Sequence, residues 1–154
     1  MQRIASLYDR AVTLVGSRTA EGVALLLTRV ALAGVFWRAG RSKVVEGSWF
    51  ELSDSTRYLF EHDYSAVPLP PELAAPMALM AEHLFPALLL IGLATRFSAL
   101  ALLGMTLVIQ VFVYPDAWWA THILWVALAA ILIARGGGVV SLDAMIDGRR
   151  GRLG

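Results

Sequence analysis

The sequence contains no cysteine and few charged residues. Of its 154 residues, 16% are charged and 58% are hydrophobic, whereas a soluble domain has about 25% charged and about 45–50% apolar residues. The absence of cysteine excludes disulfides, thiol redox chemistry and iron–sulfur ligation by this chain. The net charge is only +1, and we expect no nucleic-acid partner. The shortage of charge points instead to a chain that lies in a lipid bilayer.

The apolar residues gather in four runs, each close to the length that crosses a bilayer. A hydrocarbon core of about 30 Å requires about 20 helical residues at 1.5 Å per residue. We therefore expect an all-α, integral membrane four-helix bundle. The predicted spans are residues 22–38, 73–94, 97–114 and 117–134.

Three predicted segments lie outside the spans: two flank the four-span domain 22–135, and one is a loop inside it. Residues 1–21 place apolar side chains at helical spacing, which predicts an amphipathic helix in the membrane interface, the alternative being a solvated leader. Residues 39–72 form a long polar loop in which "RYLFEHDY" predicts a short helix that ends before "PLPP". Residues 136–154 form a tail. No cleavage site precedes the first apolar run, so no removable signal peptide is predicted.

Lysine and arginine are distributed unevenly between the two sides of the membrane. Four lie on the side of the 39–72 loop: Arg38, Arg41, Lys43 and Arg57. Eight lie on the other side: Arg3, Arg10, Arg18, Arg96, Arg135, Arg149, Arg150 and Arg152. Because cytoplasmic loops carry the excess of these residues, both termini are predicted to be cytoplasmic, in a multi-pass protein of a bacterial-type inner membrane.

Polar residues interrupt the spans at similar predicted depths. Arg29, Glu82, His83, Gln110 and His122 fall within a band of about 10 Å that begins at the midplane and extends into the outer half. A charged residue at this depth costs on the order of 2.5–3.5 kcal/mol when it has no partner. The simplest arrangement is an ion pair between Arg29 and Glu82. Such a pair could serve chemistry, or it could be structural and fix helix order and register.

The sequence around Glu82 has two further features. His83 is the next residue, and side chains of neighbouring helical residues diverge by about 100°, so we expect His83 to face another helix or a cavity. Pro86 lacks the N–H that would bond to the carbonyl of Glu82, which frees that backbone acceptor where the polar side chains lie.

The last two spans carry polar and aromatic stripes. Thr106, Gln110 and Tyr114 share one face of the third span, and the fourth span presents a second stripe of Trp118, His122 and Trp125. If these faces meet, they form an outer-half pocket that could hold a quinone head group, with His122 or Glu82 moving protons. The alternative is ordinary hydrogen bonding between helices together with aromatic residues at the membrane boundary.

Haem and metal sites have little support in the sequence. His83 and His122 could ligate haem from different helices, but their predicted depths differ by about 5 Å or more. A metal site formed by Glu82, His83 and His122 lacks any short ligand-spacing motif. We therefore predict neither.

The sequence resembles the DoxX family of small four-helix membrane proteins over about residues 22–145. The matching segments are "RVALAGVFWRAGRSKV" (29–44), "STRYLFEHDY" (55–64), "PLPPELAAPMALMAEHLFPALLLIGLATR" (68–96), "GMTLVIQVFVYPDAW" (104–118), "THILW" (121–125) and "RGGGVVSLD" (135–143). The resemblance implies a four-helix membrane fold with cytoplasmic termini, and the family pattern carries over to Arg29, Glu82 and Arg96. The family is named for a subunit of an archaeal thiosulfate:quinone oxidoreductase. Other members are partners of redox and detoxification enzymes, and distant eukaryotic relatives act as assembly chaperones or cargo receptors.

Three functional hypotheses follow. The first is a membrane subunit or partner of a redox or detoxification system that binds quinone. The second is a non-catalytic scaffold or assembly chaperone, in which an Arg29–Glu82 pair is structural. The third is a small proton-coupled transporter with Glu82 as the titrating group, which four spans could form only as a homo-oligomer.

Overall fold

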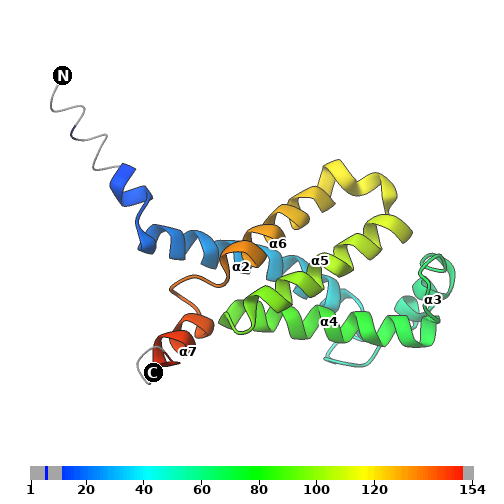
Figure 1. Ribbon diagram of the computed structural model, residues 1–154. Coiled ribbons are helices and arrows are strands. Elements are labelled where there is room, and N and C mark those ends of the chain that lie inside the picture. Colours follow the sequence, from blue (N-terminus) through cyan, green and yellow to red (C-terminus); the bar gives the residue numbers. More distant parts are fainter. Residues whose placement is uncertain (1–5, 7–11, 151–154) are drawn as a thin grey trace.

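The computed structural model describes residue 6 and residues 12–150, with side chains as far as residue 148. Helices make up the fold (Figure 1), and the described residues contain no strand, only an isolated bridge between Val44 and Leu52. The all-α prediction is therefore confirmed. The elements are α2 (Arg18–Ser42), α3 (Asp54–His62), α4 (Pro71–Ile91), α5 (Thr95–Phe112), η1 (Pro115–Ala117), η2 (Trp118–His122), α6 (Ile123–Arg135) and α7 (Leu142–Arg150).

Four helical segments are long and apolar enough to cross a membrane: α2, α4, α5 and the continuous segment Pro115–Arg135. This confirms the predicted membrane bundle. Helix α2 extends beyond both ends of the predicted span 22–38, because hydropathy marks the hydrocarbon crossing and not the end of the helix. Its start is set by Ser17, whose side chain accepts a hydrogen bond from the backbone N–H of Ala20 at 3.2 Å.

The fourth membrane segment begins irregularly. Its first turn, η1, is a 3₁₀-helix, and η2 is a π-helix that contains His122. Regular α-helix starts only at Ile123. Single π turns inside longer helices occur frequently at functional sites, so the backbone around His122 is itself a reason to examine this residue.

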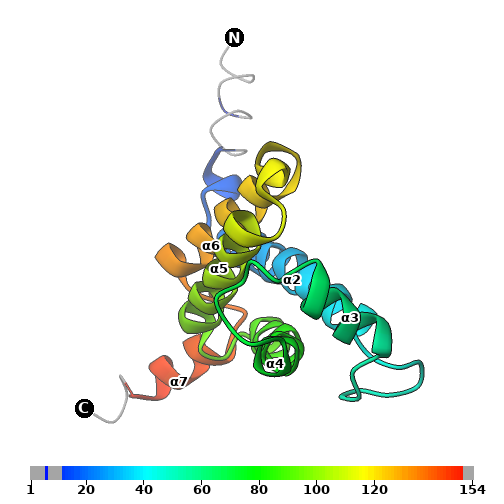
Figure 2. The ribbon, with the colours of Figure 1, turned by 90° about the vertical axis from the view of Figure 1, so that its right-hand side faces the viewer.

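The core lies where α2, α5 and α6 meet the α7-side part of α4. Its fully buried apolar side chains come from all four helices: Leu32, Ala33 and Phe36 of α2, Leu89 of α4, Leu102 of α5 and Leu132 of α6. Helices α4 and α5 are joined by a tight turn in which Gly92 has φ 70°. From that turn the two helices diverge toward the α3 end of the bundle, and α3 and α7 lie at opposite ends (Figures 1 and 2).

The polar loop between α2 and α4 contains the predicted short helix. Ser53 caps α3 by accepting a hydrogen bond from Thr56 N–H at 3.2 Å, and α3 ends at His62, ahead of the proline-rich stretch. About half of the segment predicted as an amphipathic N-terminal helix, residues 1–5 and 7–11, falls outside the described residues. Within it, residues 12–15 are helical, with Val12, Leu14 and Val15 exposed.

Candidate functional site

Glu82 forms an ion pair with Lys43, and the predicted pair between Arg29 and Glu82 is wrong. Lys43 Nζ lies 2.7 Å from Glu82 Oε2 and donates to Oε1 at 2.9 Å. Arg29 is buried elsewhere and donates from Nη2 to the carbonyl oxygen of Val140 at 2.5 Å. Glu82 therefore has a cationic partner, but the partner comes from the end of α2 and not from its middle.

The register between α2 and α4 explains the error. A Cβ added to Gly40 would lie 3.1 Å from Glu82 Cβ, so Glu82 is level with Gly40. A Cβ added to Gly92 would overlap Arg29 Nη1, so Arg29 is level with Gly92. About ten residues of α4, or about 15 Å, separate these two levels. Depth estimated from the middle of each apolar run placed Arg29 and Glu82 together, whereas packing offsets the two antiparallel helices.

Local structure holds Lys43 at the end of α2. Its carbonyl oxygen accepts hydrogen bonds from Ser53 N–H and Thr56 Oγ1, both at 3.0 Å. These bonds fix the start of the loop against α3 and leave the side chain directed to α4. Lys43 is the one lysine of the sequence. Sequence reasoning missed its role because it assigned Lys43 to the loop, although a long apolar stem lets lysine reach between polar and apolar surroundings.

His83 faces α2 and the polar loop. Its Nδ1 bonds to the carbonyl oxygen of Leu79 at 2.9 Å, so Nδ1 carries the proton and the buried Nε2 has no hydrogen-bond partner among the described residues. Its ring lies 5.2 Å from the ring of Trp37 and 6.0 Å from that of Phe50. Helix α4 continues through Pro86 in this region. His83 therefore lies in an aromatic setting, against Trp37 and Phe50.

His122 and Gln110 form the contact that the two stripes predict. Gln110 donates from Nε2 to the carbonyl oxygen of Pro115 at 2.6 Å, which leaves Oε1 to accept from His122 Nδ1 at 2.7 Å. With its proton on Nδ1, neutral His122 carries a free lone pair on Nε2. The ring of Trp125 lies 5.0 Å from the imidazole.

Two tyrosines, Tyr64 and Tyr114, lie in the same region. The hydroxyls of Tyr64 and Tyr114 lie 3.1 Å apart. Burial, the hydrogen bond with Tyr114 and the negative charge of Glu82 raise the pKa of Tyr64 well above its ordinary value. Tyr64 is therefore a neutral phenol that can donate or accept a hydrogen bond.

These side chains surround a cavity of about 500 Å³ between α4 and α5. We call it the loop-side cavity. Most of its walls are apolar, from residues such as Met77, Ala78, Met105 and Ile109. Its polar members are Ser42, Lys43, Tyr64, Glu82, Tyr114 and His122, with Trp125 beside them.

The predicted site residues divide into those at the cavity and those away from it. Glu82, Tyr114, His122 and Trp125 line it, and Gln110 orients His122. The others do not line it: Arg29 lies toward α7, His83 faces Trp37, Thr106 bonds to the carbonyl oxygen of Leu102, and Trp118 lies in the π turn. No group of three metal-ligating side chains occurs in the part of the chain that the structure describes.

Comparison with known proteins places the chain in a family. The profile of the DoxX family matches residues 24–115, more than half of the sequence. The chain belongs to the DoxX family. The matched DoxX region includes Lys43, Tyr64, Glu82 and Tyr114, and it stops short of His122. An uncharacterized protein of Haemophilus influenzae is 33% identical over 142 residues, covering 82% of this chain and 85% of the relative. No solved structure matches this DoxX protein.

Proposed function

We propose that this DoxX protein is the membrane partner of a redox enzyme and binds a quinone in the loop-side cavity. The observation that carries the proposal is His122. Gln110 holds its imidazole with the Nε2 lone pair free, in a mostly apolar cavity that also contains the Lys43–Glu82 pair. A mostly apolar cavity with a few fixed polar groups is the usual form of a small-molecule site.

The size and chemistry of the cavity fit the head group of a quinone. Ligand pockets range from about 300 to about 1,000 Å³, and this cavity measures about 500 Å³. The apolar walls and Trp125 suit a flat ring. The two ring oxygens need hydrogen-bond donors, which Lys43 Nζ and the Tyr64 hydroxyl supply.

The position of the cavity favours a ligand that is dissolved in the membrane. Two of its lining residues are also exposed on the outside of the bundle: Met77 of α4 is 58% exposed and Val108 of α5 is 41% exposed. Both lie within membrane-crossing helices, where exposed side chains face lipid. A lipophilic molecule could therefore enter sideways between α4 and α5.

The residues of the cavity have separate roles in this proposal. A bound quinone supplies two-electron redox chemistry, and the partner enzyme supplies or receives the electrons. His122 Nε2 would take up, or return, one of the two protons that accompany the two electrons. Gln110 keeps the imidazole in the tautomer that this transfer needs. Lys43, held by Glu82, would donate a hydrogen bond to a ring oxygen.

The other two hypotheses have less support. The scaffold hypothesis assigned a structural role to a pair between Arg29 and Glu82, and that pair does not form. The transporter hypothesis relied on Glu82 as a titrating group, whereas Glu82 is held by Lys43. Each predicts that quinone does not bind in the cavity, so a binding measurement separates them from the redox hypothesis.

Quenching of tryptophan fluorescence by a short-chain ubiquinone, with the protein in mild detergent, tests the proposal. We expect saturable quenching, because Trp125 lines the cavity, and loss of most of the saturable part in Trp125→Phe. His122→Ala should weaken binding about tenfold, the typical effect of removing one hydrogen bond from a buried polar site. His62→Ala is the matched control, since His62 is exposed on α3. Quenching that never saturates, or that is unchanged in His122→Ala, would refute quinone binding at this site.

We also propose that the α7 end of the bundle faces the cytoplasm of a bacterial-type inner membrane. Arg18, Arg96 and Arg135 all lie at this end, beside the ends of membrane-crossing helices. Under the positive-inside rule, this distribution supports a loop-side cavity in the outer half of the membrane.

A further inference from the structure

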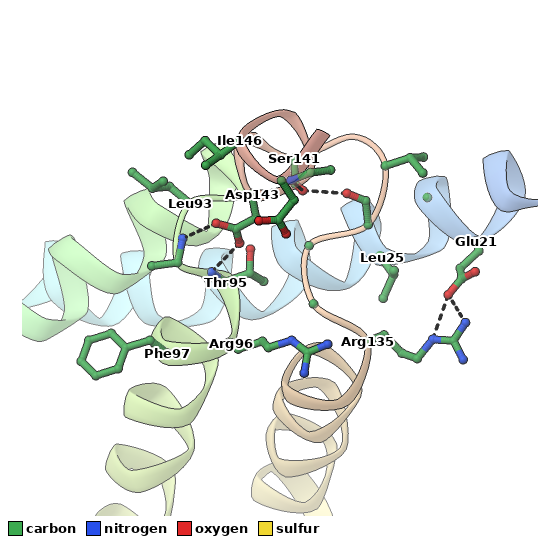
Figure 3. Close-up of a pocket in the computed structure, with 18 of the residues that line it drawn as sticks. Glu21, Leu25, Leu93, Thr95, Arg96, Phe97, Arg135, Ser141, Asp143 and Ile146 are labelled. Atoms are coloured by element: carbon green, nitrogen blue, oxygen red, sulfur yellow. Dashed lines mark hydrogen bonds and ion pairs between the residues drawn. The ribbon is translucent and has the colours of Figure 1, made fainter. Parts of the chain in front are cut away.

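A second pocket, of about 750 Å³, lies at the opposite end of the bundle from the loop-side cavity. We call it the tail-side pocket (Figure 3). It is lined by residues at the starts of α2, α5 and α7, by the end of α6, and by the glycine-rich stretch 136–138. Three arginines line it: Arg18, Arg96 and Arg135.

The tail forms one wall of this pocket and is firmly docked. The Asp143 carboxylate accepts hydrogen bonds from the N–H groups of Ala94 and Thr95 at 2.8 and 2.9 Å, and Asp143 N–H donates to Gly92 O at 2.9 Å. Burial raises the pKa of Asp143. The hydrogen bonds from Thr95 and Ala94 and the positive charge of Arg29 outweigh this effect and hold the pKa below its ordinary value. Asp143 is therefore an ionised cap on α5.

The acidic groups of the pocket leave two arginines without a partner. Glu21 forms an ion pair with Arg135, and the Asp143 carboxylate accepts hydrogen bonds from the N–H groups at the start of α5. Asp147 is exposed on α7. Within the described part of the chain, no hydrogen bond or ion pair reaches the guanidinium of Arg18 or Arg96. Figure 3 shows the Arg96 side chain extending from α5 to the end of α6, where a Cβ on Gly136 would lie 3.4 Å from Arg96 Nε.

The positions of these arginines are electrostatically unfavourable for the helices that carry them. Arg18 and Arg96 lie in the first turns of α2 and α5, where the macrodipole favours negative charge. Behind the pocket wall, Arg29 is buried next to Ser141, and its Nε and Nη1 have no hydrogen-bond partner among the described residues. The pocket therefore presents the guanidinium groups of Arg18 and Arg96, which have no partner among the described residues, and this is an arrangement suited to an anion.

We infer that the tail-side pocket binds a phosphate ester, with Arg18 and Arg96 as its ligands, and that the phosphate belongs to a membrane lipid. Guanidinium groups match phosphate oxygens in pairs. A lipid is favoured as the source because apolar side chains border the arginines: Phe97 is 62% exposed and Ile146 39% exposed. They provide a surface for acyl chains at the ends of the spans.

Native mass spectrometry of the full-length protein in detergent, titrated with dioleoylphosphatidylglycerol, tests this inference. We expect one bound lipid per chain in the wild type. Arg96→Gln and Arg18→Gln should each weaken binding about tenfold, as expected for the loss of one charge-assisted contact. Arg96→Lys should retain part of the affinity. Arg57→Gln on α3 is the matched control and should bind normally. Dioleoylglycerol, which lacks the phosphate, should bind weakly to all variants.

Two soluble probes identify the source of the phosphate. If glycerol 1-phosphate or inorganic phosphate binds as tightly as the lipid and depends on the same arginines, the phosphate site stands but a lipid is not its source. Equal lipid binding by the wild type and Arg96→Gln, or equal binding of dioleoylglycerol and the phospholipid, would overturn the inference. Thermal unfolding of each variant without lipid separates loss of binding from loss of fold.

Discussion

The pairing of Lys43 with Glu82 predicts that removing Lys43 lowers the unfolding free energy more than removing the charge of Glu82. The Glu82 side chain is 3% exposed and that of Lys43 is 15% exposed. Lys43→Met leaves a buried carboxylate without its partner, which costs about 3–5 kcal/mol of unfolding free energy. Glu82→Gln leaves an ammonium at the end of α2 that can turn toward water, and we expect a cost of only about 1 kcal/mol. Lys43 should therefore be the more costly residue to remove.

Unfolding in detergent micelles by increasing sodium dodecyl sulfate, followed by circular dichroism, measures these costs. The double variant Lys43→Met/Glu82→Gln should be more stable than the sum of the single costs predicts, with a coupling of about 2 kcal/mol. Arg29→Met combined with Glu82→Gln should show additive costs, because the two residues do not touch. Arg57→Met controls for the loss of a surface cation. Coupling of Glu82 with Arg29 but not with Lys43 would refute the register described for α2 and α4.

Three further predictions concern the turn, the tail and the topology. Gly92→Ala should lower the unfolding free energy by at least about 2 kcal/mol, because Gly92 has φ 70° and a Cβ there would overlap Arg29. The same change at Gly34, where a Cβ meets nothing within 4 Å, should be neutral or stabilise by up to about 1 kcal/mol. The Thr95 amide should be protected from hydrogen exchange at neutral pH and should lose protection when the pH is lowered below about 4. The reason is that the folded pKa of Asp143 lies below its ordinary 3.8, and the stability that its carboxylate provides is lost as the pH drops through that pKa. Asp143→Asn should lower protection at pH 7 and abolish that fall, and a fall that persists would contradict the assignment. In intact cells, an impermeant maleimide should label Ser55→Cys on α3 but not Gly148→Cys on α7, and the opposite pattern would reverse the proposed topology.

The sequence was sufficient to predict the four membrane helices. Each run of apolar residues is long enough to cross the bilayer, and that length does not depend on tertiary packing. The contact between Gln110 and His122 was also predictable, because each residue belongs to a stripe on one helix face and a tight turn joins the two helices. The resulting polar pair is the best-predicted part of the site.

Other parts of the site depend on tertiary packing and were not predictable. The partner of Glu82 is set by the offset between α2 and α4, which a depth estimate from hydropathy cannot resolve. Lys43 is directed to Glu82 by hydrogen bonds from Ser53 and Thr56, two residues of a loop whose path the sequence does not reveal. The docking of α7 depends on a cap from Asp143, which is distant in sequence from the helix that it caps.

Variants that fill the loop-side cavity test whether quinone binding needs its open volume. Ala101→Phe places a ring in the loop-side cavity from α5, and Ala130→Phe places the same ring on the exposed face of α6. The added ring could also disturb folding of the bundle. Each variant is therefore compared with the wild type only where its purified yield and thermal stability equal those of the wild type.

The measurement that tests the quinone site most directly is the amount of quinone that co-purifies with the protein from native membranes in mild detergent. Mass spectrometry of the organic extract gives moles of quinone per mole of chain. The wild type, His62→Ala and Ala130→Phe are predicted to retain close to one quinone each, while His122→Ala and Ala101→Phe lose most of it. Equal quinone content in all five proteins, or none in the wild type, would contradict a quinone site in the loop-side cavity.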